Sequence, residues 1–482
     1  MYPVATSFIP VTVSLARFAA ENSWFTIYPY WYLGSTPFNY LTGPIVPTLL
    51  VALAKILPNF SLFDLSYFIL ITSHFALSLG WGVFGWSLSK KKTIGILIFL
   101  ISLVLPWKLV SSLALSDVSA VLASALTPWV LAAFAVILNF KFKILNLLLP
   151  AVAFALLLLT NTVASIPAMV GLLVLGVTAF QKWEEGLKKV VIVVLVGWVL
   201  TLWWYEPNFW LTIFKAPSFG GKSAVSVFLW LFNLLRGLVP VILAVAVVWW
   251  GFSKKDKFLR FSISWFAIFL ILTILRFLSN PDFWLDWTSW MGEVEIGLVL
   301  LVAKNFKFQI SNFQSNRNFK LKIAKTSIFY LLFTSYFIVG WFFAWQKRDF
   351  WLPRKSIEET AEYRIASFLN ENVKSDETVF LSGTTAFWLN SFYDIKQVRG
   401  GADQASLHST WRDAAWELRQ GASTQKAEIW LKKLGIDYIV VHTNKSSEFY
   451  HDFKNTEKFE RSSILRKFYD QRGDLIYRVD DN

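Results

Sequence analysis

Cysteine is absent from the 482 residues of the chain, which excludes disulfide bonds, thiolate nucleophiles and cysteine metal ligands. Charged residues are scarce as well. They make up 16% of the chain, whereas a soluble globular protein is usually about one quarter charged. No P-loop, no G-x-G-x-x-G and no H-E-x-x-H motif occurs, so these signatures of nucleotide binding and of zinc proteases are missing too.

Hydrophobic residues dominate instead and account for 55% of the chain. They gather in apolar segments that approach the roughly 20 residues a helix needs to cross a bilayer. Because lipid offers no hydrogen-bond partners, segments that cross it must be helical. We therefore predict a polytopic α-helical membrane protein with about ten spans. The expected spans are Leu65–Leu88, Thr93–Val110, Val118–Leu138, Ile144–Leu159, Val163–Phe180, Val190–Trp204, Val225–Trp250, Phe258–Leu278, Trp287–Ala303 and Ile328–Trp345.

The net charge of +14 is unevenly distributed. From Lys347 onward, 21 basic and 21 acidic residues cancel, whereas five short loops hold 18 basic and three acidic residues. Short basic loops stay on the cytoplasmic side of a membrane. We therefore expect a multi-pass protein of the plasma (inner) membrane with no nucleic-acid partner, whose C-terminal domain is extracytoplasmic. The basic loops are Lys90–Lys92, Lys141–Lys143, Lys182–Lys189, Lys254–Arg260 and Lys304–Lys325.

The first 64 residues form a separate external segment in this scheme. As a helix, Gly43–Leu57 reaches only about 22 Å, less than a bilayer core of about 30 Å. Counting it as a span would place the basic loops outside, so we interpret it as a re-entrant or juxtamembrane helix on the outer face. Ala5–Ala20 carries Arg17 and is typical of an interfacial helix. Either this weakly apolar segment spans the membrane after all, or a first transmembrane helix is missing before Met1. The sequence favours the missing helix.

Residues 65–346 then form the transmembrane domain, and residues 347–482 form a soluble α/β domain. Helices alternate with strands in the last part, as such a domain requires. Ser356-x-x-Glu359 fits a capping box and predicts a helix to about Asn370. The other expected elements are strands at Thr378–Ser382, Ile436–His442 and Leu475–Val479 and a helix at Ala427–Leu434 that Gly435 ends.

The stretch from Trp31 to Pro47 reads Trp-Tyr-Leu-Gly-Ser-Thr-Pro-Phe-Asn-Tyr-Leu-Thr-Gly-Pro-Ile-Val-Pro. A tryptophan, a Gly-x-x-Pro and a proline-punctuated short helix resemble the first external loop of GT-C glycosyltransferases, membrane enzymes that use polyprenyl-phosphate-linked sugars. Within that superfamily, the chain is most similar to the "6-pyruvoyl-tetrahydropterin synthase-related" membrane proteins, although their name implies no pterin chemistry here. The resemblance implies a GT-C-like fold with an outer α/β domain.

The resemblance also implies an acidic residue in the first external loop, as general base or metal ligand, and a second one in the next external loop. Glu21 is the only acid before the motif, and Asp117 lies in the second expected outer loop. Ser116-Asp117 equally suits a helix N-cap. Glu206 lies at the outer interface, where it contributes to the site or is simply solvated. If the protein needs a divalent metal such as Mg or Mn, Asp117 and Glu206 are its candidate ligands.

A phosphate leaving group needs a cation. Arg236 lies inside an expected span, where a charge costs about 2.5–3.5 kcal/mol and normally faces a partner or a wet cavity. It either binds the lipid phosphate or pairs with Glu293 or Glu295, which point to different sides of their helix because they are two residues apart. Arg276, near an outer loop, is the second phosphate-binding candidate, with an interfacial ion pair as the alternative.

The most distinctive segment of the C-terminal domain is Val398–Gln404, whose paired glycines allow a tight loop. Asp403 and Gln404 are candidates for contact with a sugar acceptor, and a structural turn is the alternative. His408, His442 and His451 lack metal-ligand spacing.

Together these features favour a membrane glycosyltransferase that moves a sugar from a polyprenyl-phosphate donor to an extracytoplasmic acceptor, with membrane lipid as its other partner. Two alternatives remain open. One is a transporter or flippase of lipid-linked sugars, and the other is a non-catalytic relative whose outer domain binds glycan or partner proteins. The outer-face acids and the membrane arginine favour the transferase or the flippase. The lack of an acid within the Trp31–Pro47 motif itself favours the flippase or the non-catalytic relative.

Overall fold

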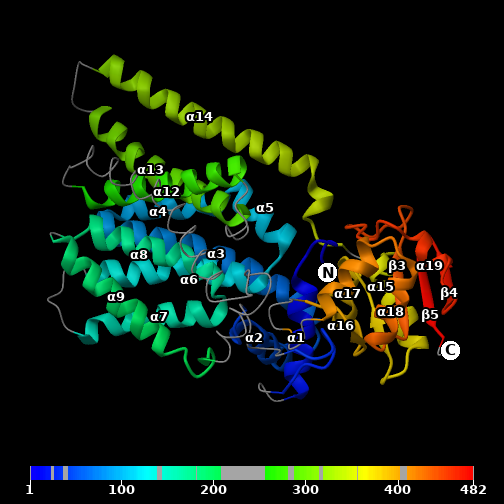
Figure 1. Ribbon diagram of the computed structural model, residues 1–482. Helices are drawn as coiled ribbons and strands as arrows, with labels where there is room; N and C mark the ends of the chain where they lie inside the picture. The colour runs from blue at the N-terminus through cyan, green and yellow to red at the C-terminus, as the bar shows by residue number, and fades with distance from the viewer. Residues whose placement is uncertain are drawn as a thin grey trace.

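A computed structural model describes residues 2–22, 26–35, 42–137, 144–180, 182–207, 256–279, 287–313, 319–354, 356–401, 406 and 410–480. Figure 1 shows a helical part and a C-terminal domain, with the N-terminal helices α1 and α2 close to the junction between them. The helices of the first part are α1 (Ile9–Glu21), α2 (Ile45–Ile56), α3 (Leu62–Ser89), α4 (Lys92–Ser102), α5 (Pro106–Leu115), α6 (Val118–Val136), α7 (Ile144–Thr160), η2 (Val163–Ser165), α8 (Ile166–Thr178), α9 (Trp183–Val199), α12 (Lys257–Ser279), α13 (Trp287–Phe313) and α14 (Phe319–Gln346).

Several of these helices can cross a membrane by length and hydropathy. Three described helices qualify, namely Leu62–Ser89, Val118–Val136 and Lys257–Ile274. α4 and α5 supply a fourth if the pair, which is bent by 47°, is one broken span. The helical, membrane-type architecture is therefore confirmed at this level. The total of about ten spans and their orientation stay predictions, and the expected span Val225–Trp250 lies outside the described residues.

The helical part packs around a continuous apolar core to which α3, α6, α8, α12 and α13 all contribute. Trp81 and Trp265 meet edge to face in it, with ring centroids 5.1 Å apart, and neither is exposed. Close packing of α3 against α6 depends on Gly80, because an added Cβ would lie 2.7 Å from the indole nitrogen of Trp129. That indole donates a hydrogen bond to the Ala76 carbonyl across the same contact.

The short helix expected at Gly43–Leu57 is present as α2. Its 12 residues give it a length of about 18 Å, too short to cross a bilayer core of about 30 Å. The chain enters it through Gly43, whose N–H donates to the Thr160 carbonyl at the end of α7. An added Cβ at Gly43 would lie 1.8 Å from the Leu159 carbonyl oxygen, so only glycine permits this approach.

The helix expected at Ala5–Ala20 is present as α1, but it is not a surface helix. Eight of its 13 residues are buried, and it packs against α2 on one side and α16 of the C-terminal domain on another. The Arg17 guanidinium donates to the Asn390 carbonyl and lies 3.3 Å from a carboxylate oxygen of Asp394. Arg17 therefore joins the N-terminal segment to the C-terminal domain, and the expected position of this helix at the membrane interface stays a prediction.

The C-terminal domain is built on a five-stranded mixed sheet with strand order β2-β1-β3-β5-β4. β1 pairs in parallel with β2 and β3, and the last two strands add antiparallel pairs. The expected α/β character and its three expected strands are confirmed. The elements are η4 (Arg348–Phe350), α15 (Ala361–Asn372), β1 (Thr378–Phe380), α16 (Thr384–Phe392), β2 (Lys396–Gln397), α17 (Trp411–Gln420), α18 (Thr424–Lys433), β3 (Tyr438–His442), α19 (Glu457–Glu460), β4 (Leu465–Gln471) and β5 (Asp474–Val479).

The capping box expected at Ser356-x-x-Glu359 is wrong. The Ser356 hydroxyl donates to the Glu358 carboxylate, and α15 begins five residues later. Thr360 is the N-cap, since its hydroxyl accepts the Tyr363 N–H. A complete capping box forms instead at α3, between Ser61 and Asp64.

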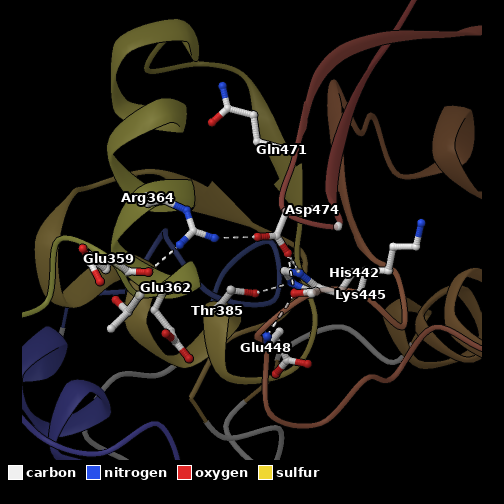
Figure 2. Close-up of polar contacts among 12 residues, drawn as sticks. Glu359, Glu362, Arg364, Thr385, His442, Lys445, Glu448, Gln471 and Asp474 are labelled. Carbon is white, nitrogen blue, oxygen red and sulfur yellow. Dashed lines mark hydrogen bonds and ion pairs between the residues drawn. The ribbon is translucent and has the colours of Figure 1, made fainter.

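A buried polar network joins α15, α16, β3 and β5 in this domain (Figure 2). Asp474, which is fully buried, lies 3.1 Å from the Arg364 guanidinium and 2.9 Å from Nδ1 of His442. Nε2 of His442 lies 3.1 Å from the Thr385 hydroxyl. This hydroxyl–imidazole–carboxylate chain has the composition of a hydrolytic triad, but His442 and Thr385 are each only 1% exposed. No substrate can reach it, so it stabilises the domain.

We expect Asp474→Asn to lower the free energy of unfolding by about 2–3 kcal/mol at neutral pH, because charge-assisted hydrogen bonds contribute that much. Burial alone would raise the pKa of Asp474, but hydrogen bonds from His442 and Ser446, together with Arg364, lower it below its ordinary value of 3.8. The unfolded chain therefore binds this proton more tightly. The stabilisation is complete above pH 3.8 and is lost as pH falls through the folded-state pKa.

Acid unfolding followed by tryptophan fluorescence measures this effect. The variant should unfold more readily at neutral pH and lose part of the acid-induced transition. Asp470→Asn is the matched control, because Asp470 is exposed and pairs with the exposed Lys467. Equal acid midpoints for the wild type and Asp474→Asn would contradict the assignment.

Candidate functional site

A cavity of about 300 Å³ lies among α1, α5, α6, α8 and α13. This volume is at the lower end of the range for ligand sites, roughly 300–1,000 Å³. Apolar side chains make most of its wall, with a few polar groups among them, as in most ligand sites. The polar lining residues are Thr12, Thr42, Lys108, Ser111, Ser112, Asp117, Ser119, Ser124, Asn161 and Glu293.

Lys108 provides the cation of this cavity. It lies on α5, and its side chain is only 10% exposed. Its Nζ donates to Oε1 of Glu293 at 3.0 Å and to the Ser124 hydroxyl at 2.9 Å. The other carboxylate oxygen of Glu293, Oε2, is buried and has no hydrogen-bond partner in the described structure. The cavity therefore holds a buried ion pair with one spare acceptor position.

Glu295 positions Lys108 through the backbone. Its carboxylate accepts the N–H groups of Trp107 and Lys108, at 2.9 and 2.8 Å, in the first turn of α5. A carboxylate there satisfies orphan donors and complements the helix dipole. The hydroxyl of Tyr336 on α14 bonds the same carboxylate. Glu293 and Glu295 were expected to point to different sides of their helix. Both contact Lys108, Glu293 at its side chain and Glu295 at its backbone N–H.

Asp117 is both a helix cap and a cavity residue. Its Oδ1 accepts the Ala120 N–H at 3.0 Å and the Ser119 hydroxyl at 2.7 Å, so the expected N-cap of α6 is confirmed. The chain turns sharply into this position because Ser116, the C-cap of α5, has φ 46°. Asn161 extends the polar row by donating to the Ser119 hydroxyl at 3.2 Å. The carboxylate is half-buried and lines the cavity.

The C-terminal domain also contributes to the wall through Gly401. Trp31 packs against Gly400 and Gly401, and its indole donates to the side chain of Asn390 in α16 at 3.0 Å. An added Cβ at Gly400 or Gly401 would lie 2.3 or 2.6 Å from the Trp31 ring, so both glycines allow close packing. The Tyr32 hydroxyl donates to the Gly400 carbonyl. Trp31 and Tyr32 therefore fasten the C-terminal domain to the wall of the cavity.

The structure brings together only part of the set that the sequence suggested. Glu21 ends α1 and is exposed, and Glu206 is exposed as well, and neither lines the cavity. Arg276 belongs to α12, but its side chain is outside the described structure, and Arg236, Asp403 and Gln404 lie wholly outside it. Their proposed roles in binding phosphate and acceptor stay predictions.

Lys108 is the functional candidate that the sequence analysis missed. It lies inside the expected span Thr93–Val110, and its ion pair with Glu293 could not be anticipated because the two residues are 185 positions apart. A lysine beside Pro106 in an apolar stretch was the available signal. The expected metal stays a prediction too, since no three His, Asp or Glu side chains gather as ligands within the described ranges.

Among known proteins, only solved structures show a similarity to the chain, and the similarity concerns its fold. No protein-family model matches the chain, and no curated protein matches it. Among solved structures, it resembles the archaeal oligosaccharyltransferase AglB from Archaeoglobus fulgidus in complex with an inhibitory peptide and a dolichol-phosphate, with TM-score 0.55, 13% identity and 90% of this chain covered. The chain spans 64% of that protein. The apo form of the Archaeoglobus fulgidus oligosaccharyltransferase gives TM-score 0.54 at 11% identity, over all of this chain and 71% of that one.

The likeness shows an overall fold similar to that of AglB, with helices followed by a mixed α/β domain, whereas the assignment to the GT-C superfamily stays a prediction. At this level of identity it supports the architecture alone. The narrower resemblance to the pterin-synthase-related membrane proteins stays a prediction.

Proposed function

We propose that the chain is a membrane glycosyltransferase that transfers a sugar from a polyprenyl-phosphate donor to an extracytoplasmic acceptor. The observation that carries the proposal is one cavity lined by both Asp117 and Lys108, in a chain whose fold resembles AglB. The AglB structure contains a dolichol-phosphate, which is the donor chemistry proposed here.

The two side chains suit the two charges that develop during transfer. Asp117 accepts the proton of the attacking acceptor hydroxyl, and its bonds to Ala120 and Ser119 hold it in place. Lys108 stabilises the negative charge on the departing phosphate, which is worth most in a cavity that excludes water. Glu293 keeps Lys108 oriented before the donor binds.

A divalent metal would add positive charge at the phosphate if it bound. The described residues gather no ligand cluster for one, so no step here is routed through it. Lys108 performs the charge neutralisation in this mechanism.

The test is a transfer assay with the protein in liposomes, a polyprenyl-phosphate-linked hexose and a set of saccharide acceptors. Ala120→Leu adds three carbons at the cavity wall and should reduce transfer by roughly tenfold, since obstructing the bound substrate by about 1.4 kcal/mol in the transition state has that effect. Ala133→Leu, on the same helix but outside the cavity, is the matched control. Equal rates for the two variants would contradict the proposed site.

The same assay separates transfer from transport. The buried Lys108–Glu293 pair would also suit a flippase that carries an anionic headgroup through the cavity without chemistry. Movement of a labelled donor across the liposome membrane, without any glycosylated product, would favour that alternative.

A further inference from the structure

The strand order of the C-terminal domain marks a second place where a ligand is expected. β1 connects through α16 to β2 on one side, and the chain then crosses back through α17 and α18 to β3 on the other side of β1. The connections therefore diverge between β1 and β3. In open α/β sheets, ligands bind outside the carboxyl ends of the strands at such a switch point.

A charged cluster occupies this edge of the sheet. Ser382 follows β1, Arg399 follows β2, and Asp452 lies in the connection after β3, while Arg419 approaches from α17. The Asp452 carboxylate lies 3.1 Å from the Arg419 guanidinium and 3.4 Å from that of Arg399. The Ser382 hydroxyl donates to the same carboxylate and accepts from Arg399.

Two guanidinium groups thus share one carboxylate, which leaves one formal positive charge. The side chains of Arg399, Arg419 and Asp452 are 20%, 23% and 23% exposed, so a ligand can reach them. Nε of Arg399 is buried and has no hydrogen-bond partner in the described structure. Burial and then the neighbouring Arg419 lower the pKa of Arg399, as expected for crowded like charges.

The N-terminus of the nearby helix α16 already has a carboxylate partner of its own. The Thr384 N–H at the start of α16 donates to the buried Glu448 carboxylate at 2.7 Å. The free positive charge of the switch point therefore resides in the two arginines.

We propose that Arg399 and Arg419 bind an oxyanion of the acceptor, a carboxylate or a phosphate on an acidic saccharide. Arg399 precedes the cavity residue Gly401 by two positions, and two residues span at most about 7 Å. An acceptor anchored at the arginines can therefore extend its reacting hydroxyl toward Asp117. The acceptor assignment rests on the proposed glycosyl transfer, whereas the anion site itself does not.

Titration calorimetry on the full chain in detergent tests the site with three probes: a glucuronate-terminated oligosaccharide, its glucose-terminated counterpart and inorganic phosphate. The glucuronate probe should bind and the neutral one should not. Arg419→Gln should weaken binding at least about tenfold, because it removes a charge-assisted hydrogen bond. Asp452→Asn should strengthen it about tenfold, because the competing carboxylate is gone. Arg461→Gln, an exposed pair with Glu457, should change nothing.

The two variants should change the binding affinity in opposite directions. If the ion pair were only structural, both variants would bind more weakly or unfold. Should Arg419→Gln or Asp452→Asn fail to fold, Arg419→Lys serves instead, because it keeps the positive charge and should retain most of the affinity. Equal binding of all variants, or binding of the neutral probe, would overturn the site. Phosphate binding as tight as that of the glucuronate probe would overturn the acceptor assignment. Anion binding with the expected pattern but no transfer would refute the proposed function alone.

Discussion

Asp117→Asn is expected to reduce glycosyl transfer by about 10²- to 10⁴-fold without destabilising the protein. A general base contributes a factor of this size. Asparagine is as good an N-cap as aspartate, so the bonds to Ala120 and Ser119 can persist and α6 can begin where it does now. The variant thus separates the two roles of one side chain. Initial rates of transfer at saturating donor, together with thermal denaturation of the same preparation, measure both.

Two further variants sharpen the result. Asp117→Ala should lose transfer and also about 1 kcal/mol of stability, because the cap is gone. Asp64→Asn alters another acidic residue in a helix cap, one that does not line the cavity, and should leave the transfer rate unchanged. A wild-type rate for Asp117→Asn would show that Asp117 is a cap and nothing more.

Lys108→Met is expected to lower the free energy of unfolding by about 3–5 kcal/mol. The substitution leaves the Glu293 carboxylate buried without its counter-ion, and an uncompensated buried charge costs this much. The double variant Lys108→Met, Glu293→Gln should recover most of the stability, because the buried charge is removed with its partner. Donor binding should stay weak in both variants, since the cation for the phosphate is missing.

Reversible denaturation in a detergent micelle measures the stability effects, and binding of a polyprenyl phosphate measures the functional one. Lys189→Met is the control, because Lys189 is equally buried but its partner Glu185 is 53% exposed and keeps water as a substitute. Its cost should be about 1 kcal/mol or less. Donor binding restored in the double variant would contradict the role of Lys108.

Local signals in the sequence predicted much of the C-terminal domain. The apolar run at Ile436–His442 contains β3, whose five residues are all buried, and Gly435 ends α18 with φ 58°. The N-cap role of Asp117 was equally local. Each of these features depends on neighbours a few residues away, so pattern and propensity suffice to find it.

Contacts between distant segments were beyond such reasoning. The pairing of Lys108 with Glu293, and of Arg17 with Asp394, depends on tertiary packing that no spacing encodes. The failure at Ser356 concerns position, since the helix starts four residues later, where Thr360 is the N-cap. Arg399, Arg419 and Asp452 likewise meet only because the strand order brings two connections, the one after β2 and the one after β3, to one edge of the sheet.

An experimental structure of the full chain with a non-hydrolysable polyprenyl-phosphate sugar analogue tests the central claim most directly. We predict density for the phosphate within hydrogen-bond distance of the Lys108 Nζ and for the sugar between it and Asp117. A headgroup bound elsewhere, with the Lys108–Glu293 pair intact and the cavity unfilled, would contradict the account.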